Sequence, residues 1–160
     1  MSVRQWRRSG SKGRRATDDA PFNVPRASTE KPMVLVVDFD PAVCLMQAIY
    51  LKELGCQVFT AHDGFAALEH ASALLPDVIV MSLDIPRLDG CEAIRRLNES
   101  SSTRRIPVVA VTEDPNSRLK AFEAGCTAYL MKPCTPQIIW AQICALLRLP
   151  ESRAIRPGQS

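Results

Sequence analysis

The chain from Pro32 onward alternates two patterns of hydrophobic and polar positions. Short apolar runs rich in β-branched residues, typical of buried strands, occupy residues 33–38, 56–61, 77–82, 106–112 and 128–132. Longer stretches with apolar residues at helical spacing follow them, at about 41–54, 64–74, 90–99, 115–124 and 135–148. Each predicted strand is therefore followed by one predicted helix.

Residues at the borders of these segments support the same division. Asp40-Pro41 and Asp114-Pro115 each place a capping carboxylate before a proline that suits a first helical turn, while Gly55 and Gly125 end helices. Near-continuous apolar strands that alternate with helices indicate an α/β fold whose parallel sheet is covered on both faces. Ligands of such sheets bind beyond the carboxyl ends of the strands, so functional residues are expected there.

The charge of the chain is uneven. Residues 1–31 contain eight Lys or Arg and three Asp or Glu, a charge of +5, which leaves −2 for the remainder of a chain with net charge +3. This segment has few apolar residues, so we expect a basic disordered N-terminal tail. Residues 32–149 are predicted to form one domain, and residues 150–160 a short C-terminal tail.

Apolar runs in the sequence are strand-sized, whereas a membrane-spanning helix needs about 18 residues. We therefore expect no membrane span and, by default, a cytoplasmic protein. Six cysteines stand singly, without a C-x-x-C pair, and are expected to be reduced and structural: Cys44, Cys56, Cys91, Cys126, Cys134 and Cys144.

Polar residues stand at the carboxyl ends of four of the predicted strands: Asp38-Phe39-Asp40, Ser82, Thr112 and Lys132-Pro133. Six segments agree together in order and spacing: VLVVDFDP, AHDGFAAL, PDVIVMSLDIPRLDG, IPVVAVT, EAGCTAYLMKP and PQIIWAQICALLR. In these motifs, over about residues 32–149, the chain resembles the response-regulator receiver domain, the CheY-like phosphoacceptor of two-component signalling. The resemblance implies a flavodoxin-like, doubly wound (βα)5 parallel sheet with strand order 2-1-3-4-5.

The resemblance also implies a chemistry. In the family, an aspartate that ends strand three accepts a phosphoryl group, and Mg²⁺ is held by that aspartate and an acidic pair after strand one. A lysine and a hydroxyl bind the phosphoryl group, and an aromatic side chain on strand five moves inward. Position by position, Asp38 matches the first acid, Thr112 the hydroxyl, Tyr129 the aromatic switch and Lys132 the lysine. The resemblance implies a cis bond between Lys132 and Pro133.

Two positions of this site depart from the family. Ser82 stands at the phosphoacceptor position, counted from either side, and Phe39 stands at the second acidic position. Asp40 is expected to cap the following helix instead, and Glu113 would repel an incoming phosphoryl group. With Asp38 as the residual metal ligand, we expect Mg²⁺ binding to be lost or weak. We interpret the chain as an atypical pseudo-receiver with no catalytic residue and no cofactor.

Alternative acceptors remain. Ser82 lacks an adjacent base, and its phosphate would lack the ready transfer of an acyl phosphate. Asp84 lies two residues after Ser82, and side chains two residues apart in an extended chain point to the same side, so Asp84 could face the same way as Ser82. The first rival interpretation is therefore a receiver phosphorylated at Asp84 or Asp40.

Without a phosphoryl group, the retained residues are expected to have structural roles. Lys132 would pair with Asp38, Thr112 would bond the backbone, and Phe39 would plug the vacated metal pocket. Tyr129 is expected to keep one rotamer. A small ligand in the pocket stays open as an alternative, and it would have to match Asp38, Lys132 and Thr112.

The last predicted helix suggests a partner site. Ile138 and Cys144 stand where the family usually has charged residues, and Trp140 stands where it has an aliphatic one, so the outer face is more apolar unless these side chains extend the core. Receivers generally dimerise or bind partners through helix four, strand five and helix five. We place the partner site on that face, with these candidates: Arg118, Tyr129, Ile138 and Trp140.

These inferences predict a stand-alone, non-enzymatic receiver of a phosphorelay system. It would act by phosphorylation-independent contact with a protein such as a histidine kinase or a downstream effector, and a homodimer is one form of that contact. The second rival interpretation is nucleic-acid binding through the Arg-rich tail, where Trp6 lies among arginines. An anchor to an acidic protein or membrane surface is a further interpretation of this tail.

Overall fold

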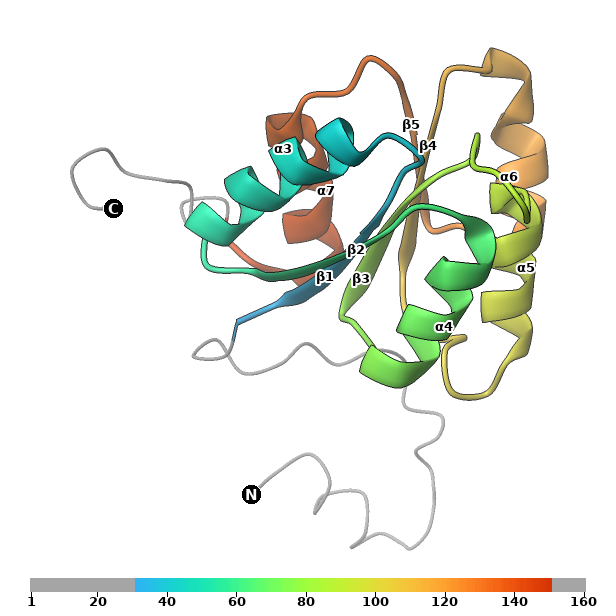
Figure 1. The fold of residues 1–160 in the computed structure, drawn as a ribbon, viewed down its shortest axis with the longest axis horizontal. Helices are drawn as coiled ribbons and strands as arrows, with labels where there is room; N and C mark the ends of the chain where they lie inside the picture. Colours follow the sequence, from blue (N-terminus) through green and yellow to red (C-terminus); the bar gives the residue numbers. More distant parts are fainter. Residues whose placement is uncertain (1–30, 151–160) are drawn as a thin grey trace, which may run out of the picture.

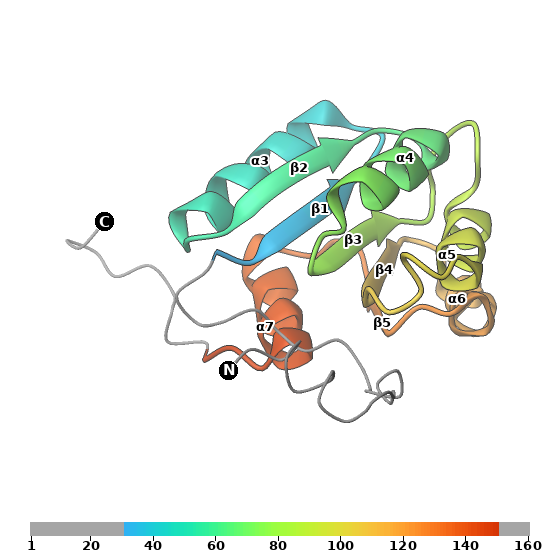
Figure 2. The same cartoon turned by 90° about the horizontal axis from the view of Figure 1, so that it is seen from below.

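Short, mostly apolar segments form five parallel strands of one sheet, in the order β2-β1-β3-β4-β5. The computed structural model describes residues 31–150. The strands are β1 (Met33–Val37), β2 (Gln57–Ala61), β3 (Val78–Ser82), β4 (Val108–Thr112) and β5 (Ala128–Met131). Figure 2 shows them side by side. The predicted fold class and strand order are confirmed.

Helices follow the strands as predicted. They are α3 (Pro41–Glu53), α4 (Gly64–Leu74), α5 (Gly90–Glu99), α6 (Arg118–Ala124), which follows a 3₁₀ turn η1 (Pro115–Ser117), and α7 (Pro136–Leu147). Helices α3 and α7 cover one face of the sheet, and α4, α5 and α6 cover the other (Figure 1). The result is a layer of sheet between two layers of helices.

Local signals in the sequence fix the helix ends. The Asp40 carboxylate accepts a hydrogen bond from the Ala42 amide at 2.9 Å and caps α3, and Asp114 caps η1 in the same way. Gly125 ends α6 with φ of 116°, a left-handed conformation that glycine adopts without steric cost. Strand β4 begins two residues later than predicted, at Val108, because Pro107 has no N–H to donate to a ladder.

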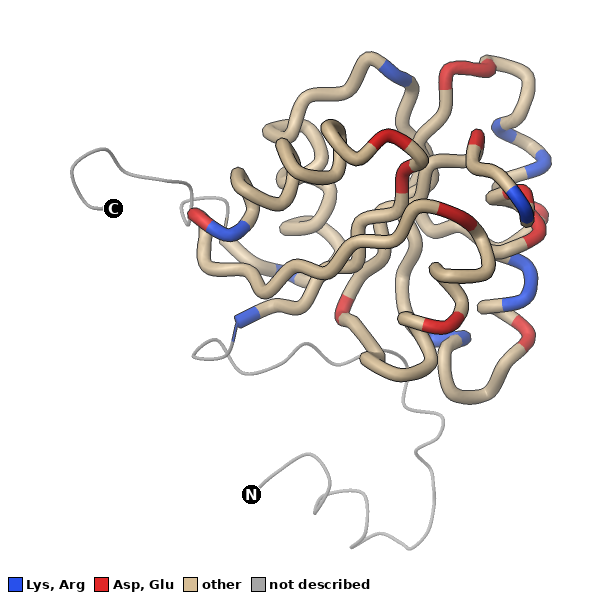
Figure 3. The backbone as a smooth tube through the Cα atoms, viewed as in Figure 1, with Lys and Arg blue, Asp and Glu red and all other residues tan. Residues whose placement is uncertain are grey.

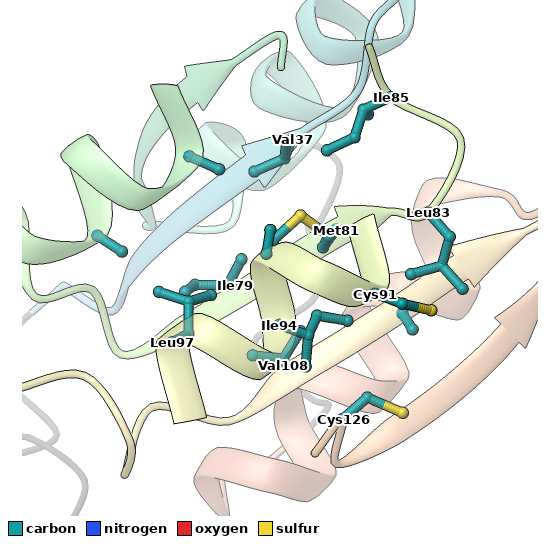
Figure 4. Packing of buried hydrophobic residues seen from close by; sticks show 14 of the residues in the cluster. Val37, Ile79, Met81, Leu83, Ile85, Cys91, Ile94, Leu97, Val108 and Cys126 are labelled. Atoms are coloured by element: carbon teal, nitrogen blue, oxygen red, sulfur yellow. The ribbon is translucent and has the colours of Figure 1, made fainter. Parts of the chain in front are cut away.

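The two faces of the sheet pack into separate hydrophobic cores. The core under α4, α5 and α6, here called the α4–α6 core, includes Ile79, Met81, Ile94 and Ala110. Figure 4 shows side chains of this core, among them Ile79, Met81 and Ile94, packed close together. The core under α3 and α7, here called the α3–α7 core, includes Val36, Val80, Ile139 and Ile143. Alternate residues of each strand thus enter opposite cores.

The remaining predictions concern the ends of the chain and the membrane. Residues 1–30 and 151–160 lie outside the described residues, so the predictions of a disordered basic tail, of nucleic-acid binding through it and of a C-terminal tail stay predictions. No helix between residues 31 and 150 combines the length and hydropathy that a membrane crossing requires.

Candidate functional site

The polar residues predicted at the strand ends gather at the carboxyl-terminal edge of the sheet. Asp38 directly follows β1, Ser82 ends β3, Thr112 ends β4, and Lys132 directly follows β5. Asp38, Ser82 and Thr112 are buried, with exposed fractions of 4% or less. Figure 3 shows acidic positions around this edge, with a basic position among them. The parallel register therefore brings four residues that are far apart in the chain to one place.

The Lys132 ammonium is the centre of a polar cluster. Nζ donates to Asp38 Oδ2 at 3.1 Å and to the Ser82 hydroxyl at 3.3 Å. The other carboxylate oxygen of Asp38 accepts the Asp40 amide at 3.0 Å. The predicted ion pair between Lys132 and Asp38 is confirmed, and the bond between Lys132 and Pro133 is cis. An ammonium group donates hydrogen bonds and accepts none, so Lys132 cannot act as a base that removes the Ser82 hydroxyl proton.

Thr112 belongs to a second, separate set of bonds. Its hydroxyl donates to Asp84 Oδ2 at 3.2 Å and accepts the Asp114 amide at 3.1 Å. The prediction that Thr112 bonds the backbone is confirmed, and its second bond is to a carboxylate. Asp84 is exposed, as is Glu113 beside Thr112. The Thr112 hydroxyl therefore bonds residues of the β3–α5 and β4–α6 loops, whereas Lys132 bonds Asp38 and Ser82.

Phe39 does not plug the vacated position. Its side chain is 57% exposed and stands at the rim of a pocket, so the prediction of a plug is wrong. The physical reason is the turn that leads into α3: Asp38 points inward to Lys132 and Asp40 caps the helix, which leaves the intervening side chain directed outward. Asp40 has the predicted capping role.

Three acidic side chains at this edge, those of Asp38, Asp40 and Asp84, accept hydrogen bonds from other groups of the chain. Among residues 31–150, no group of three or more His, Cys, Asp or Glu side chains is placed to hold a metal ion. Asp38 is engaged by Lys132, Asp40 caps α3, and Asp84 accepts from Thr112. The carboxylates thus serve three different local structures.

A pocket of about 570 Å³ opens beside this cluster, toward α3. Its polar lining includes Asp38, Ser82 and Lys132, and its apolar walls come from β1, β3, β4, α3 and the loop between β5 and α7. Sequence reasoning missed the contribution of α3, which supplies Val43, Met46 and Gln47. A signal was present: Gln47 is a polar residue in the helical repeat of the buried residues Cys44, Ala48 and Leu51.

Gln47 is an exception to the rule that buried polar groups are paired. Its side chain is 7% exposed, and within residues 31–150 its Oε1 has no hydrogen-bond partner. Leaving a buried acceptor without a donor costs about 1 to 3 kcal/mol. The neighbouring Cys44 is a buried thiol whose pKa is raised to about 11, first by burial and then by the nearby Asp38 charge, so it stays protonated at neutral pH.

The predicted partner face is formed by α6, β5 and α7. The Arg118 guanidinium lies 5.1 Å from the centre of the Phe122 ring and 5.8 Å from that of Tyr129, and these two rings are 6.2 Å apart. The Tyr129 hydroxyl donates to the Asp114 carbonyl at 2.9 Å. Ile138 is 47% exposed. Sequence reasoning missed three other exposed apolar side chains in this part of the chain: Leu119, Phe122 and Met131.

Trp140 does not belong to this face, so its prediction as a partner residue is wrong. The side chain is 3% exposed and packs in the α3–α7 core, as does Cys144. The reason is the helical period: Trp140 shares a face with Ile143, Cys144 and Leu147, all of which are buried, whereas Ile138 falls on the other side. None of the six cysteines, which all lie within residues 31–150, forms a disulfide.

Comparisons with known proteins agree on one family. A family model described as the response regulator receiver domain matches residues 34–143. The chain is 34% identical over 119 residues to the DNA-binding dual master transcriptional regulator RpaA of Synechocystis sp. and 31% identical over 121 residues to the alkaline phosphatase synthesis transcriptional regulatory protein PhoP of Bacillus subtilis. These matches cover 73% and 76% of this chain and 49% and 50% of the relatives, so the chain spans about half their length.

Solved structures give the same result. The receiver domain of the sensor histidine kinase PA1611 of Pseudomonas aeruginosa, which has a magnesium ion coordinated in its active site cleft, matches with a TM-score of 0.69 and 27% identity over 74% of this chain and 98% of that domain. The chemotaxis response regulator CheY4 of Vibrio cholerae matches with a TM-score of 0.69 and 26% identity over 73% of this chain and 99% of that protein.

Proposed function

The chain belongs to the response regulator receiver family, and we propose that it signals there as a pseudo-receiver, by contact with a protein partner and without phosphorylation at the end of strand three. The observation that carries this proposal is Ser82. It occupies the end of β3, is 2% exposed, and its hydroxyl oxygen accepts a hydrogen bond from Lys132. A serine without an adjacent base is a weak nucleophile.

Loss of useful Mg²⁺ binding is part of the same proposal. The similar receiver domain of PA1611 has a magnesium ion coordinated in its cleft. Here the two acidic positions after β1 hold Asp38, which is buried and paired with Lys132, and the outward-facing Phe39, and the phosphoacceptor position holds Ser82. Two carboxylates that would be needed to attract a hard cation are replaced, so the affinity for Mg²⁺ should be low.

A titration followed by two-dimensional amide NMR tests the proposal. Mg²⁺ is added first and beryllofluoride second, because this anion mimics an aspartyl phosphate where an acceptor and a metal are present. We expect no shifts of the amides of Ser82, Thr112 and Tyr129. The matched control is the double variant Phe39→Asp, Ser82→Asp, which restores both acidic positions and is expected to respond.

Shifts in the unmodified protein would contradict the proposal and return the interpretation to a working phosphoacceptor. The variant Asp84→Asn then identifies the acceptor: a response that disappears assigns it to Asp84, whose carboxylate accepts from Thr112. A response that persists in Asp84→Asn but disappears in Asp40→Asn assigns it to Asp40, although that carboxylate caps α3.

We propose that a histidine kinase, a downstream effector or a second copy of the chain is contacted through α6, β5 and α7. Arg118 stacks over two aromatic rings, and Ile138 and Leu119 are exposed on α7 and α6, so these elements together supply the aromatic, arginine and apolar groups that are enriched at interfaces. This mixture supports the choice of face. The homodimer is tested by sedimentation over a concentration series.

The expected result of that series is self-association that is lost in Ile138→Lys. The matched control is Leu45→Lys, a change of the same kind at a side chain of α3 that is 61% exposed. Equal loss in both variants, or loss in the control alone, would exclude this face as the contact between copies. A monomer at every concentration would leave the kinase or effector as the partner.

A further inference from the structure

The pocket beside Lys132 has the size and lining of a small-molecule site. Its volume of about 570 Å³ lies within the range typical of pockets that hold organic ligands, about 300 to 1,000 Å³. Val36, Val80 and Val111 line it from the sheet, and Val43 and Met46 line it from α3. Such sites combine apolar walls with a few polar groups that orient the ligand, and both are present here.

The first polar group is the amide of Gln47. It lines the pocket, is more than nine-tenths buried, and its Oε1 has no partner within residues 31–150. This oxygen is enclosed, but the last side-chain torsion of an amide is soft, so rotation about it can bring the oxygen to the pocket. A ligand group that carries an N–H or O–H there would satisfy an acceptor that the protein itself leaves unpaired.

The second polar feature is an excess of negative charge at the rim. Lys132 and Asp38 form an ion pair and offset each other. Asp40 and Glu113 also line the pocket and add two carboxylates without a matching cation in the lining. The Phe39 ring, which is 57% exposed at the same rim, adds a surface that attracts cations. A positively charged group is therefore favoured at the rim, and an anionic one is disfavoured.

Asp40 and Gln47 also set a length. They are seven residues apart, at the cap and in the second turn of α3, so they lie on the same side of the helix. At 1.5 Å per residue their separation along the axis is about 10 Å. Val43 lies between them on that side and lines the pocket. A ligand that reaches both groups must carry them about that far apart on an apolar body.

We propose that this pocket binds a small amphipathic organic amine, with its ammonium group at the rim near Asp40, its apolar body against the valines, and a hydrogen-bond donor at the far end on Gln47. The inference goes beyond the proposed function, because a small-molecule site can exist whether or not a protein partner binds the α6, β5 and α7 face. On this proposal, the carboxyl-terminal edge of the sheet receives a signal in the form of a bound small molecule.

The experiment compares matched linear probes on the full chain by calorimetry and amide NMR. The reference probe is an eight-carbon amino alcohol with its amine and hydroxyl at opposite ends, because its extended chain matches the required separation. The comparison probes are the eight-carbon monoamine, which lacks the inner donor, the diol, which lacks the charge, and the diacid, which inverts it. We expect the amino alcohol to bind about tenfold more tightly than the monoamine, as one hydrogen bond warrants.

Two variants locate the effect. Gln47→Leu removes the acceptor and keeps the size, so the amino alcohol should bind no better than the monoamine. The matched control is Gln57→Leu, the same change at an exposed position of β2, where the tenfold difference should persist. Gln47→Leu should also melt at a higher temperature than the unmodified protein without a probe, because an unpaired buried oxygen is removed.

Three outcomes would overturn the proposal. Binding of the diacid as tight as that of the amino alcohol would contradict the charge of the rim. Equal affinities of the monoamine and the amino alcohol for the unmodified protein would remove Gln47 from the site. No amide shift at Val43, Gln47 or Val80 with any probe up to millimolar concentration would mean that the pocket binds no such ligand. None of these results alters the response to Mg²⁺ and beryllofluoride, so the two proposals fail separately.

Discussion

The two faces of the sheet differ in how completely they are filled. The α4–α6 core places large side chains such as Ile79 and Met81 at 0% exposure among small residues of the covering helices, Ala71, Ala93 and Ala121. The α3–α7 core adjoins the pocket, and both buried side-chain atoms without a partner in residues 31–150, Gln47 Oε1 and Trp140 Nε1, belong to α3 and α7. The α4–α6 core is therefore tightly packed, whereas the α3–α7 core adjoins a pocket and contains unpaired polar atoms, so it can accommodate a ligand or a substitution more easily.

The largest effect is expected from a cavity in the filled face. Ile79→Ala removes three carbons from a residue at 0% exposure, and such changes cost about 2 to 5 kcal/mol of unfolding free energy. Urea denaturation measures it. The control is Ile49→Ala on α3, a side chain that is 54% exposed, where we expect less than about 0.5 kcal/mol. Comparable losses in the two variants would contradict the packing described for the α4–α6 core.

A smaller effect is expected at the edge shared by the cluster and the pocket. Lys132→Met leaves the Asp38 carboxylate, which is 6% exposed, without its cation. We expect a loss of about 2 to 3 kcal/mol, below the range for fully buried pairs because the lysine side chain is 20% exposed. The double variant with Asp38→Asn should be more stable than Lys132→Met alone. A double variant whose loss equals the sum of the two single losses would mean that the pair is uncoupled.

A matched pair on one strand sharpens the comparison between the faces. Val108→Ala and Val111→Ala remove the same atoms from β4, but Val108 packs in the α4–α6 core and Val111 lines the pocket. Removal of two buried methyl groups costs about 1.6 kcal/mol of transfer free energy at either position. A further cost arises where the substitution creates a new cavity, and at Val111 a cavity is already present. Val108→Ala should therefore be costlier by about 1 kcal/mol in urea denaturation. The reverse order would mean that the pocket wall is the more tightly packed face.

The smallest effect is expected on the outer surface of α5. Hydrogen bonds from Arg95 and then Arg96 lower the pKa of Glu92 to about 2. A carboxylate whose folded pKa is depressed stabilises the fold above its unfolded pKa, and this stabilisation is lost as the pH falls toward about 2. Glu92→Gln should lower the melting temperature slightly at pH 7 and not at pH 2. An equal shift at both pH values would assign the effect to something other than charge.

The sequence predicted the frame of this molecule better than the directions of single side chains. Periodicity placed α4 and α5 at the residues where the structure has them, and the strand-end order brought Lys132 to Asp38 because parallel strands end at one edge. Phe39 and Trp140 were misplaced because their directions depend on a turn and on the rotation of a helix against its neighbours. The pocket at Gln47 could not be predicted, since its walls come from segments that meet only in the folded chain.

The hydrogen bond from Lys132 to Ser82 bears on the timing of a signal. A phosphoryl group is a chemical record that persists after the kinase has left, until hydrolysis removes it. Lys132, which here donates to the neutral Ser82 hydroxyl instead of to a phosphoryl group, forms no comparable long-lived covalent state. On the proposal that this receiver works by contact alone, its response ends when the bound molecule dissociates. The lifetime of the signalling state then equals the residence time of that molecule, and no phosphatase is needed to end it.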